Sequence, residues 1–232
     1  MRRIWSEFSS ISVRVLGTCA LACLPASLPA QSMVAGRVVL QEKPGEKTTD
    51  YGNTVVWLEP LSGAARATPV RTQVGMSERT FTPHVRVVPV GSAVEYPNQD
   101  PFTHNVFSTT PGALFDLGAY ASGTSKGYTF RKTGAYPTYC NIHAKMAAYV
   151  VVVNTPWYAQ AAADGRWQVT NVPAGTYRLT IWHERAPQVT TELNVPAGGL
   201  SGVETTLDAR GYRVVAHKNK FGRDYANAGV VY

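Results

Sequence analysis

Four potential metal ligands constrain what this chain can fold into. Cys140, His143 and Met146 stand at C-x2-H-x2-M spacing, and His104 lies 36 residues before Cys140, in the run HNVFS. A fold that uses all four must hold the segment carrying His104 against a short loop carrying the other three. The sequence therefore requires a rigid scaffold that keeps two distant segments in contact, with or without a metal.

The four donors form a chemically specific set. One thiolate, two imidazoles and one weak thioether make up the ligand set of a blue-copper centre. Such a set suits both Cu(I) and Cu(II), so little has to move when an electron is gained or lost. We expect His104, Cys140, His143 and Met146 to bind one type 1 copper ion, with Met146 as the long axial ligand. The predicted function is the transfer of single electrons.

Other chemistries fit the same residues less well. A zinc site would need a second pair of ligands beside Cys140 and His143, and none lies nearby. A c-type haem needs C-x-x-C-H, which is absent. A Cys–His hydrolase needs an oxyanion hole and an orienting acid, and neither is evident. The sequence contains no H-x-H motif of the kind that multicopper oxidases use, so no enzyme activity is predicted.

Three histidines lie outside the predicted copper site. His84 begins a predicted strand and is expected to be exposed. His183 and His217, with Glu184 or Asp208, leave open a second metal site, against a role in packing or in partner contacts. Such a site would not be another blue-copper centre, because no second cysteine remains for it.

The first 30 residues have the pattern of a secretory signal peptide. A basic start is followed by the apolar run from Val15 to Leu24 and by small residues that offer cleavage after Ala30. That run is short for a bilayer span, although an uncleaved anchor and lipidation at Cys23 are alternatives. Cleavage predicts a periplasmic or otherwise exported protein with no membrane span. Its one remaining cysteine, Cys140, forms no internal disulfide and is protected when a metal holds it as thiolate.

Composition favours a packed all-β protein. Hydrophobic residues make up 44% and charged residues 16% of the chain, and 20 Gly and 15 Pro indicate many turns. The net charge is +7 for the whole chain. It falls to about +5 once three Arg and one Glu of the signal peptide are removed. No Lys/Arg cluster indicates nucleic-acid binding, whereas a mild positive charge suits an acidic protein partner.

Short apolar runs separated by turn residues predict β-strands along most of the chain. Between residues 69 and 155 their spacing favours a Greek-key sandwich, with 112–124 as a long, turn-rich connection. The predicted strands are Met33–Leu40, Asn53–Pro60, Val70–Val74, His84–Val90, Ala93–Pro97, His104–Ser108, Gly127–Arg131, Ala135–Cys140, Tyr149–Asn154, Arg178–His183, Thr190–Val195 and Gly202–Leu207.

Residues 69–155 resemble the cupredoxins, especially plastocyanin and amicyanin. The matching pieces are Phe81-Thr82-Pro83, Gly91–Val94 with Asn98-Gln99-Asp100, His104-Asn105, Gly134-Ala135-Tyr136 and the run from Cys140 to Met146. The resemblance implies a cupredoxin domain that carries electrons through copper. It also implies that the Asn105 side chain hydrogen-bonds the cysteine loop, and that the edge of His143 reaches the surface and passes the electron.

The flanking segments resemble the carboxypeptidase-regulatory or transthyretin-like sandwich. The matching pieces are Gly36-Arg37-Val38, Val55–Leu58, Asp164–Trp167 and Val172–Tyr177. Residues 33–60 plus 156–210 would form this second domain, followed by a C-terminal tail, 211–232. We expect the copper domain to be inserted into a loop of the second sandwich; the alternative is an N-terminal hairpin packed on the copper domain.

Partner contacts are predicted around the metal loop. Lys145 could attract an acidic redox partner, such as a cytochrome or a periplasmic oxidoreductase, with Ala144 and Phe107 in an apolar docking patch. One rival function is copper delivery, although four methionines are few for such a protein. Another is that of an accessory subunit that docks through its transthyretin-like part and the basic run His217–Arg223.

Overall fold

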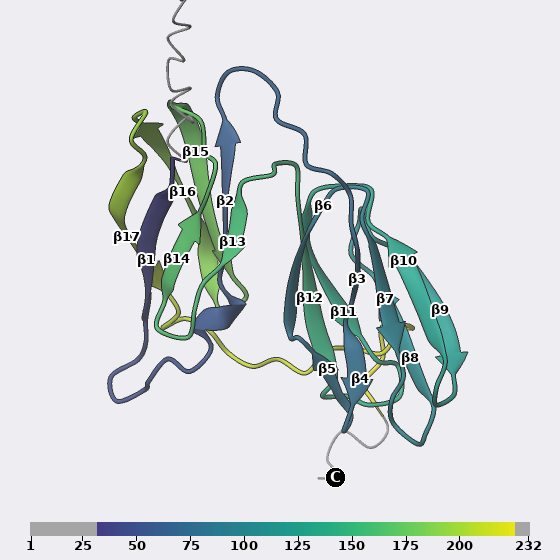
Figure 1. The fold of residues 1–232 in the computed structure, drawn as a ribbon. Helices are drawn as coiled ribbons and strands as arrows, with labels where there is room; N and C mark the ends of the chain where they lie inside the picture. The colour runs from purple at the N-terminus through teal and green to yellow at the C-terminus, as the bar shows by residue number, and fades with distance from the viewer. Residues whose placement is uncertain (1–31, 226–232) are drawn as a thin grey trace, which may run out of the picture.

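The computed structural model describes residues 32–225, and within them the chain forms 17 strands and one 3-10 turn (Figure 1). The all-β prediction is confirmed. The elements are β1 (Val34–Gln41), η1 (Tyr51–Asn53), β2 (Val55–Pro60), β3 (Arg71–Gln73), β4 (Gly75–Ser77), β5 (Thr80–Thr82), β6 (Val85–Pro89), β7 (Ala93–Pro97), β8 (His104–Ser108), β9 (Phe115–Tyr120), β10 (Ser125–Thr129), β11 (Gly134–Tyr139), β12 (Ala147–Val153), β13 (Tyr158–Gln160), β14 (Arg166–Val169), β15 (Gly175–His183), β16 (Ala186–Val195) and β17 (Leu200–Asp208).

The predicted signal peptide lies outside the described residues. Within residues 32–225, no helix is long and apolar enough to cross a membrane.

The middle of the chain forms what we call the central sandwich. One sheet has the order β10-β7-β3 and the other β6-β12-β11-β8-β9, and β4 and β5 form a separate hairpin. Buried residues of both sheets make one core, which includes Tyr96, Phe130 and Val150 together with Cys140 and Met146. The two sulfur-bearing residues of the predicted site are therefore part of the core of this sandwich.

Strands on either side of the central segment pair with each other and form what we call the flanking sandwich. Its sheets have the orders β14-β1-β17 and β13-β2-β15-β16. β1 and β2 thus pair with strands more than a hundred residues later, as Val34 with Val169 and Val56 with Ile181 show. The described segment between Leu61 and Val70 contains no strand and leads from β2 into the central sandwich (Figure 1).

Strands β12 and β2 are covered on both faces where the sandwiches meet. Alternate residues of a strand face opposite sides of its sheet. In β12, Val150 and Val152 enter the central core, whereas Val151 and Val153 enter a separate cluster. β2 divides its residues in the same way between the flanking core and that cluster. An uninterrupted apolar run is the pattern expected of strands covered on both sides.

This shared cluster joins the two sandwiches mainly through apolar packing. Four valines are fully buried in it, and two tryptophans and two tyrosines pack against them: Val55, Val85, Val151, Val153, Trp57, Trp182, Tyr149 and Tyr158. Burying one valine side chain stabilises by ~1.5 kcal/mol or more. An ion pair that is partly exposed contributes roughly 0.5 kcal/mol. The packing therefore dominates over any single ion pair at this interface.

The connection predicted over residues 112–124 is wrong in its middle, where the structure has strand β9. The run FDLG contains Asp and Gly, which are rare in strands, so the sequence did not predict β9. In the structure Phe115 and Leu117 pack against the central core, and β9 pairs with β8. Tertiary packing of two alternate apolar residues thus outweighs the local preference for a turn.

The sequence predicted that His84 would be exposed, but the structure gives its ring two hydrogen-bond partners. Its Nε2 lies 2.6 Å from a carboxylate oxygen of Glu184, in the turn between β15 and β16 of the flanking sandwich, and its Nδ1 lies 3.1 Å from the Ala147 carbonyl oxygen. The hydrogen bond with Glu184 raises the pKa of His84, outweighing burial, which lowers it. This pair therefore adds a titratable contact between the sandwiches.

The His84–Glu184 pair predicts how stability depends on pH. Because the folded-state pKa lies above the value of about 6.5 for a free imidazole, its contribution is complete below that pH and disappears as pH rises through the raised pKa. Relative to His84→Gln, the free energy of unfolding of the wild type should fall by roughly 0.5 kcal/mol across this range. Urea unfolding of both proteins at a series of pH values measures the difference. A difference that rises with pH would contradict the assignment.

Candidate metal centre

Asn98 shapes the loop that presents His104 at the start of β8. Its side-chain oxygen accepts the amide hydrogen of Asp100 at 3.0 Å, and its side-chain nitrogen donates to the carbonyls of Phe102 and Tyr120 at 2.8 and 3.2 Å. Asn98 is 1% exposed, so this buried amide has its hydrogen-bonding groups satisfied by the loop it organises. The loop places the His104 ring, which is 0% exposed, inside the sandwich.

The second segment of the site is the short loop from Cys140 to Met146, which we call the metal loop. It joins β11 to β12 and closes on itself, because the Cys140 amide donates to the Met146 carbonyl at 3.2 Å and the Met146 amide donates to the His143 carbonyl at 3.1 Å. The two strands it joins are paired from Gly134–Val152 to Tyr139–Ala147. The loop is therefore the end of a regular hairpin.

Three of the four predicted ligands meet at one point. Cys140 Sγ lies 3.7 Å from His104 Nδ1 and 3.6 Å from His143 Nδ1, and the two nitrogens lie 3.1 Å apart. A triangle with these sides has a point about 2.0 Å from each corner, close to metal–nitrogen and metal–sulfur bond lengths of ~2.0–2.3 Å. Among the described residues this is the one group of three or more His, Cys, Asp or Glu side chains that could hold a metal ion.

Asp100 determines which nitrogen of His104 faces the site. The Nε2 of His104 lies 2.7 Å from an Asp100 carboxylate oxygen, to which it donates. With its proton on Nε2, the neutral ring directs the lone pair of Nδ1 toward Cys140 and His143. A carboxylate that orients a histidine in this way is a common feature of metal sites.

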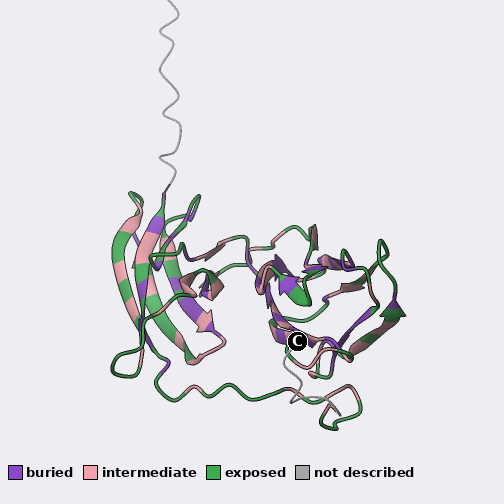
Figure 2. Ribbon diagram, turned by 90° about the horizontal axis from the view of Figure 1, so that it is seen from below, coloured by how far each residue is buried: buried purple, intermediate pink, exposed green. Residues whose placement is uncertain are grey.

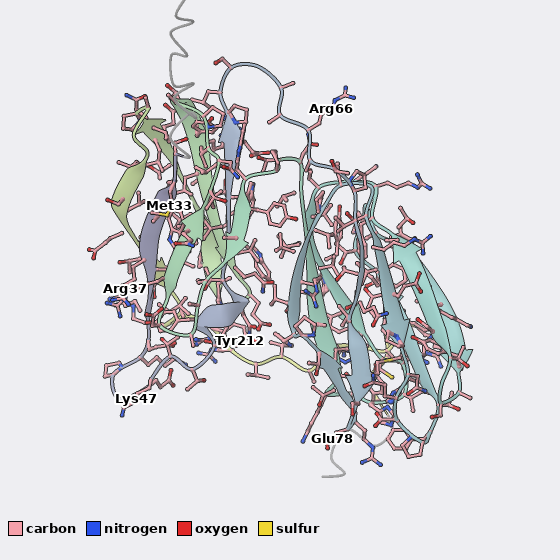
Figure 3. The ribbon with its side chains drawn as sticks, viewed as in Figure 1. Met33, Arg37, Lys47, Arg66, Glu78 and Tyr212 are labelled. Atoms are coloured by element: carbon pink, nitrogen blue, oxygen red, sulfur yellow. The ribbon has the colours of Figure 1, made fainter. Side chains whose placement is uncertain are left out.

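The same carboxylate also supports the turn between β4 and β5. It accepts the amides of Glu78 at 2.6 Å and Arg79 at 3.0 Å, both of which have left-handed backbone conformations. Burial raises the pKa of Asp100, but the hydrogen bonds from Arg79, His104 and Glu78 leave it lowered, so the group stays ionised. Glu78 in Figure 3 marks the end of the central sandwich where the site lies.

The thiol and the imidazoles are tuned by their surroundings. Burial raises the pKa of Cys140, yet hydrogen bonds with His104 and with three backbone amides (Asn105, Ile142 and His143) leave it lowered. Burial and then the charge on His104 lower the pKa of His143. The thiolate and a neutral His143 are the forms that bind metals. At His104 burial lowers the pKa, but Cys140 and Asp100 raise it overall, so a proton competes for Nδ1 in acid.

Phe102 covers the outer side of the two imidazoles. Its ring centroid lies 5.2 Å from that of His104 and 5.6 Å from that of His143. The guanidinium carbon of Arg79 lies 4.8 Å from the centroid of the Phe102 ring. His104 is fully buried and His143 is half-buried, so His143 is the ligand that approaches the surface.

Met146 is buried at the end of the metal loop, and Asn105 contacts the beginning of that loop. Met146 is 1% exposed and belongs to the same core as Cys140. The Asn105 side-chain oxygen accepts the amide hydrogen of Asn141 at 3.3 Å, so it bonds the metal loop as the resemblance implied. Residues that could hold a copper ion are thus one thiolate, two imidazoles and a buried thioether, and this donor set fits copper.

The predicted docking patch needs one correction. Lys145 is exposed and Ala144 is half-buried beside His143, so both contribute to the surface around the metal loop. Phe107 is 1% exposed and lies under Tyr139 and His217, at centroid distances of 5.9 and 6.5 Å. It forms part of the packing beneath the metal loop, because the middle of β8 is covered from both sides.

His183 and His217 do not come together as a second site. His183 lies in the flanking sandwich, where its Nε2 is 3.3 Å from the Asp50 carbonyl oxygen and its Nδ1 accepts the Arg185 amide hydrogen. His217 lies on the central sandwich, stacked on Tyr139 at 4.2 Å. The fold therefore uses the two rings in separate packing contacts.

Sequence reasoning missed the groups that surround the metal loop. Asp116 lies on β9, which was expected to be a connection, and Lys220 and Tyr225 lie in a tail without periodicity. Asp116 accepts hydrogen bonds from Asn105 and Lys220, both at 2.6 Å. Tyr225 donates to the Cys140 carbonyl at 2.6 Å. No local sequence pattern predicts these contacts, because they join residues 11 to 104 positions apart.

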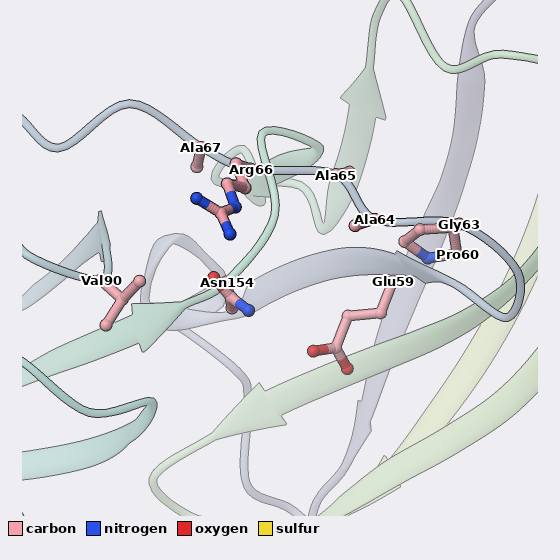
Figure 4. A pocket seen from close by; sticks show the side chains of 9 residues that line it. All are labelled: Glu59, Pro60, Gly63, Ala64, Ala65, Arg66, Ala67, Val90 and Asn154. Carbon is pink, nitrogen blue, oxygen red and sulfur yellow. The ribbon is translucent and has the colours of Figure 1, made fainter.

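A separate open pocket of ≈ 590 Å³ lies at the linker between the sandwiches (Figure 4). Its polar side chains are Glu59, Arg66 and Asn154, and the remaining lining is small or apolar. None of its lining residues belongs to the metal centre. The cluster of donors, and not this pocket, is the candidate functional site.

Comparison with known proteins gives partial structural matches. No family model and no curated protein matches the chain. A purple cupredoxin from Nitrosopumilus maritimus is 23% identical, covering 35% of this chain and 99% of its own, with a TM-score of 0.32. Amicyanin from Paracoccus versutus is 20% identical, covering 41% and 97%, with a TM-score of 0.33.

A copper-containing nitrite reductase (NirK) from Thermus scotoductus SA-01 also matches, at 24% identity and a TM-score of 0.34. The match covers 50% of this chain but only 28% of the reductase. Solved structures similar to part of the chain thus include cupredoxins. At these TM-scores the matches define no function, and the functional argument rests on the site.

The role of Asp100 can be tested by Asp100→Asn. A neutral amide orients the His104 imidazole less firmly, so we expect affinity for a bound metal to fall about 10- to 100-fold. Competition with a chelator of known affinity measures the change. Asp164→Asn is a matched control, because Asp164 pairs with Arg166 in an exposed turn. Equal affinities for all three proteins would show that Asp100 does not orient the ligand.

Proposed function

We propose that this protein is an exported carrier of single electrons with one type 1 copper ion. His104, Cys140, His143 and Met146 would hold the ion. The observation that carries the proposal is the triangle of one sulfur and two nitrogens, with sides of 3.1 to 3.7 Å, in which His104 and Cys140 are buried and Met146 is buried in the same core as Cys140. When bound, copper supplies a one-electron couple between Cu(I) and Cu(II).

The chain's own residues prepare the site for this task. His104 is oriented by Asp100, and the metal loop is closed by backbone hydrogen bonds between its two ends. A preorganised donor set moves little when the charge on the ion changes. This rigidity favours electron transfer over copper delivery, because delivery needs a site that opens to release its metal.

We assign the central sandwich to a cupredoxin domain and the flanking sandwich to a transthyretin-like domain interrupted by it. The signal-peptide pattern supports export. Half-buried His143, between half-buried Ala144 and exposed Ile142 and close to exposed Lys145, supports electron exchange there with an acidic redox protein.

Copper delivery is the second candidate function. The third is that of an accessory subunit that docks on a larger complex. Delivery requires that a partner reach the ligands. Burial of His104, Cys140 and Met146, each at 0 or 1% exposure, opposes ready transfer of the ion. Electron transfer needs only the edge of one ligand near the surface, which His143 provides.

Loading residues 31–232 with Cu(II) tests the proposed function directly. We expect intense visible absorption from the Cys140 thiolate and an EPR spectrum with the small hyperfine splitting of blue copper. A colourless protein with an ordinary tetragonal copper EPR spectrum would overturn the proposal. Rapid loss of copper to a mild chelator would favour delivery.

Two substitutions separate the roles of the sulfur ligands. Cys140→Ser should abolish the colour, because the thiolate–copper bond produces the absorption. Met146→Gln should retain blue copper with a lower reduction potential, because the axial ligand tunes the potential. Spectroscopy and redox titration measure both effects. An unchanged potential in Met146→Gln would show that Met146 is not an axial ligand.

A further inference from the structure

The C-terminal tail of the described chain returns to the metal loop. Residues 211–225 leave the flanking sandwich, run across to the central sandwich and end on it (Figures 1 and 2). Tyr212 marks the beginning of this path in Figure 3. Residues 213–216 are exposed, whereas His217, Asn219 and Lys220 are half-buried against the central sandwich. The tail therefore docks at its far end.

Three consecutive residues contact the tail: Tyr139 at the end of β11, and Cys140 and Asn141 at the start of the metal loop. The ring of Tyr139 stacks on His217 with an interplanar angle of 15°. The carbonyl oxygen of Cys140 accepts the Tyr225 hydroxyl hydrogen at 2.6 Å. The side-chain oxygen of Asn141 accepts the Lys220 amide hydrogen at 2.9 Å.

These contacts complete a closed ring of hydrogen bonds around the loop. The Asn141 amide donates to the Asn105 side chain, which donates in turn to Asp116. The Lys220 ammonium donates to the other oxygen of Asp116 at 2.6 Å, and the Lys220 amide closes the ring on Asn141. The ring joins the neighbour of His104, the neighbour of Cys140, strand β9 and the tail. It thereby links the two segments that carry the proposed ligands.

Within the tail, Tyr225 and His217 support one another. The Tyr225 hydroxyl lies 3.3 Å from His217 Nδ1, and the two rings meet edge-on with centroids 5.3 Å apart. The tail thus approaches the loop with a small packed unit and not with a single extended side chain.

We propose that residues 217–225 form a clamp on the metal loop and that Lys220 and Tyr225 are positioning residues of the metal centre. The clamp is a property of the metal-free chain. Its effect on copper binding rests on the proposed function. A hydrogen bond in folded protein contributes roughly a 2- to 10-fold change in a local equilibrium. Because linkage is reciprocal, a clamp that favours the metal-binding conformation raises metal affinity, and a bound metal strengthens the clamp.

The first experiment uses the metal-free, full-length protein. Tyr225→Phe removes only the hydroxyl, and Lys220→Ala removes the ammonium but keeps the backbone amide. We expect amide hydrogen exchange at residues 140–142 to become about 5- to 10-fold faster in each variant. Arg213→Ala is the matched control, because Arg213 is an exposed cation of the same tail that lies outside the clamp, and Tyr212→Phe is the control for a lost hydroxyl. Both controls should stay within about twofold of the wild type.

The second experiment measures the rate at which copper passes from the loaded protein to a chelator. The same two variants should release copper faster than both controls. If the chain binds no copper, the proposed function fails, and the exchange measurements still decide whether the clamp exists. Exchange rates in Tyr225→Phe and Lys220→Ala equal to those of the controls would overturn the clamp, even in a protein that binds blue copper.

Discussion

The contact between the metal loop and the beginning of β8 is the constraint on which the rest of this structure depends. It brings Cys140 Sγ to 3.7 Å from His104 Nδ1 across a separation of 36 residues. Burying a thiol, two imidazoles and a carboxylate is costly unless each finds a partner. Here they partner one another, with Asn98 and Asp100 supporting His104 from behind. The sandwich supplies the rigidity that keeps these polar groups satisfied.

The flanking sandwich contributes to the site at a distance. Its sheet covers β12 through the shared valine cluster, and β12 is one arm of the hairpin that ends in the metal loop. Its last strand, β17, leads into the tail that returns to Cys140 and Asn141. The two sandwiches therefore hold the metal loop from its base and from its side, which gives the flanking sandwich a physical connection to the metal loop.

The sequence was most informative where chemistry is local. The C-x2-H-x2-M spacing, the preceding histidine and the N-x-D run predicted the donors and the loop beside them, since each pattern is short and chemically specific. It was least informative where tertiary contacts decide. Strand β9 contains residues that favour turns, Phe107 is buried by its neighbours on both sides, and His84 finds its carboxylate 100 positions away. A pattern read over a few residues does not contain those partners.

By itself, the sequence determined the all-β class and indicated the candidate donors, because side-chain type and alternation can be recognised within short segments. Only the tertiary structure decided how the donors are supported. Lys220 and Tyr225 reach Asp116 and Cys140 across 104 and 85 residues. The path of an aperiodic tail follows from the surface on which it packs. That surface exists only after the central sandwich has folded.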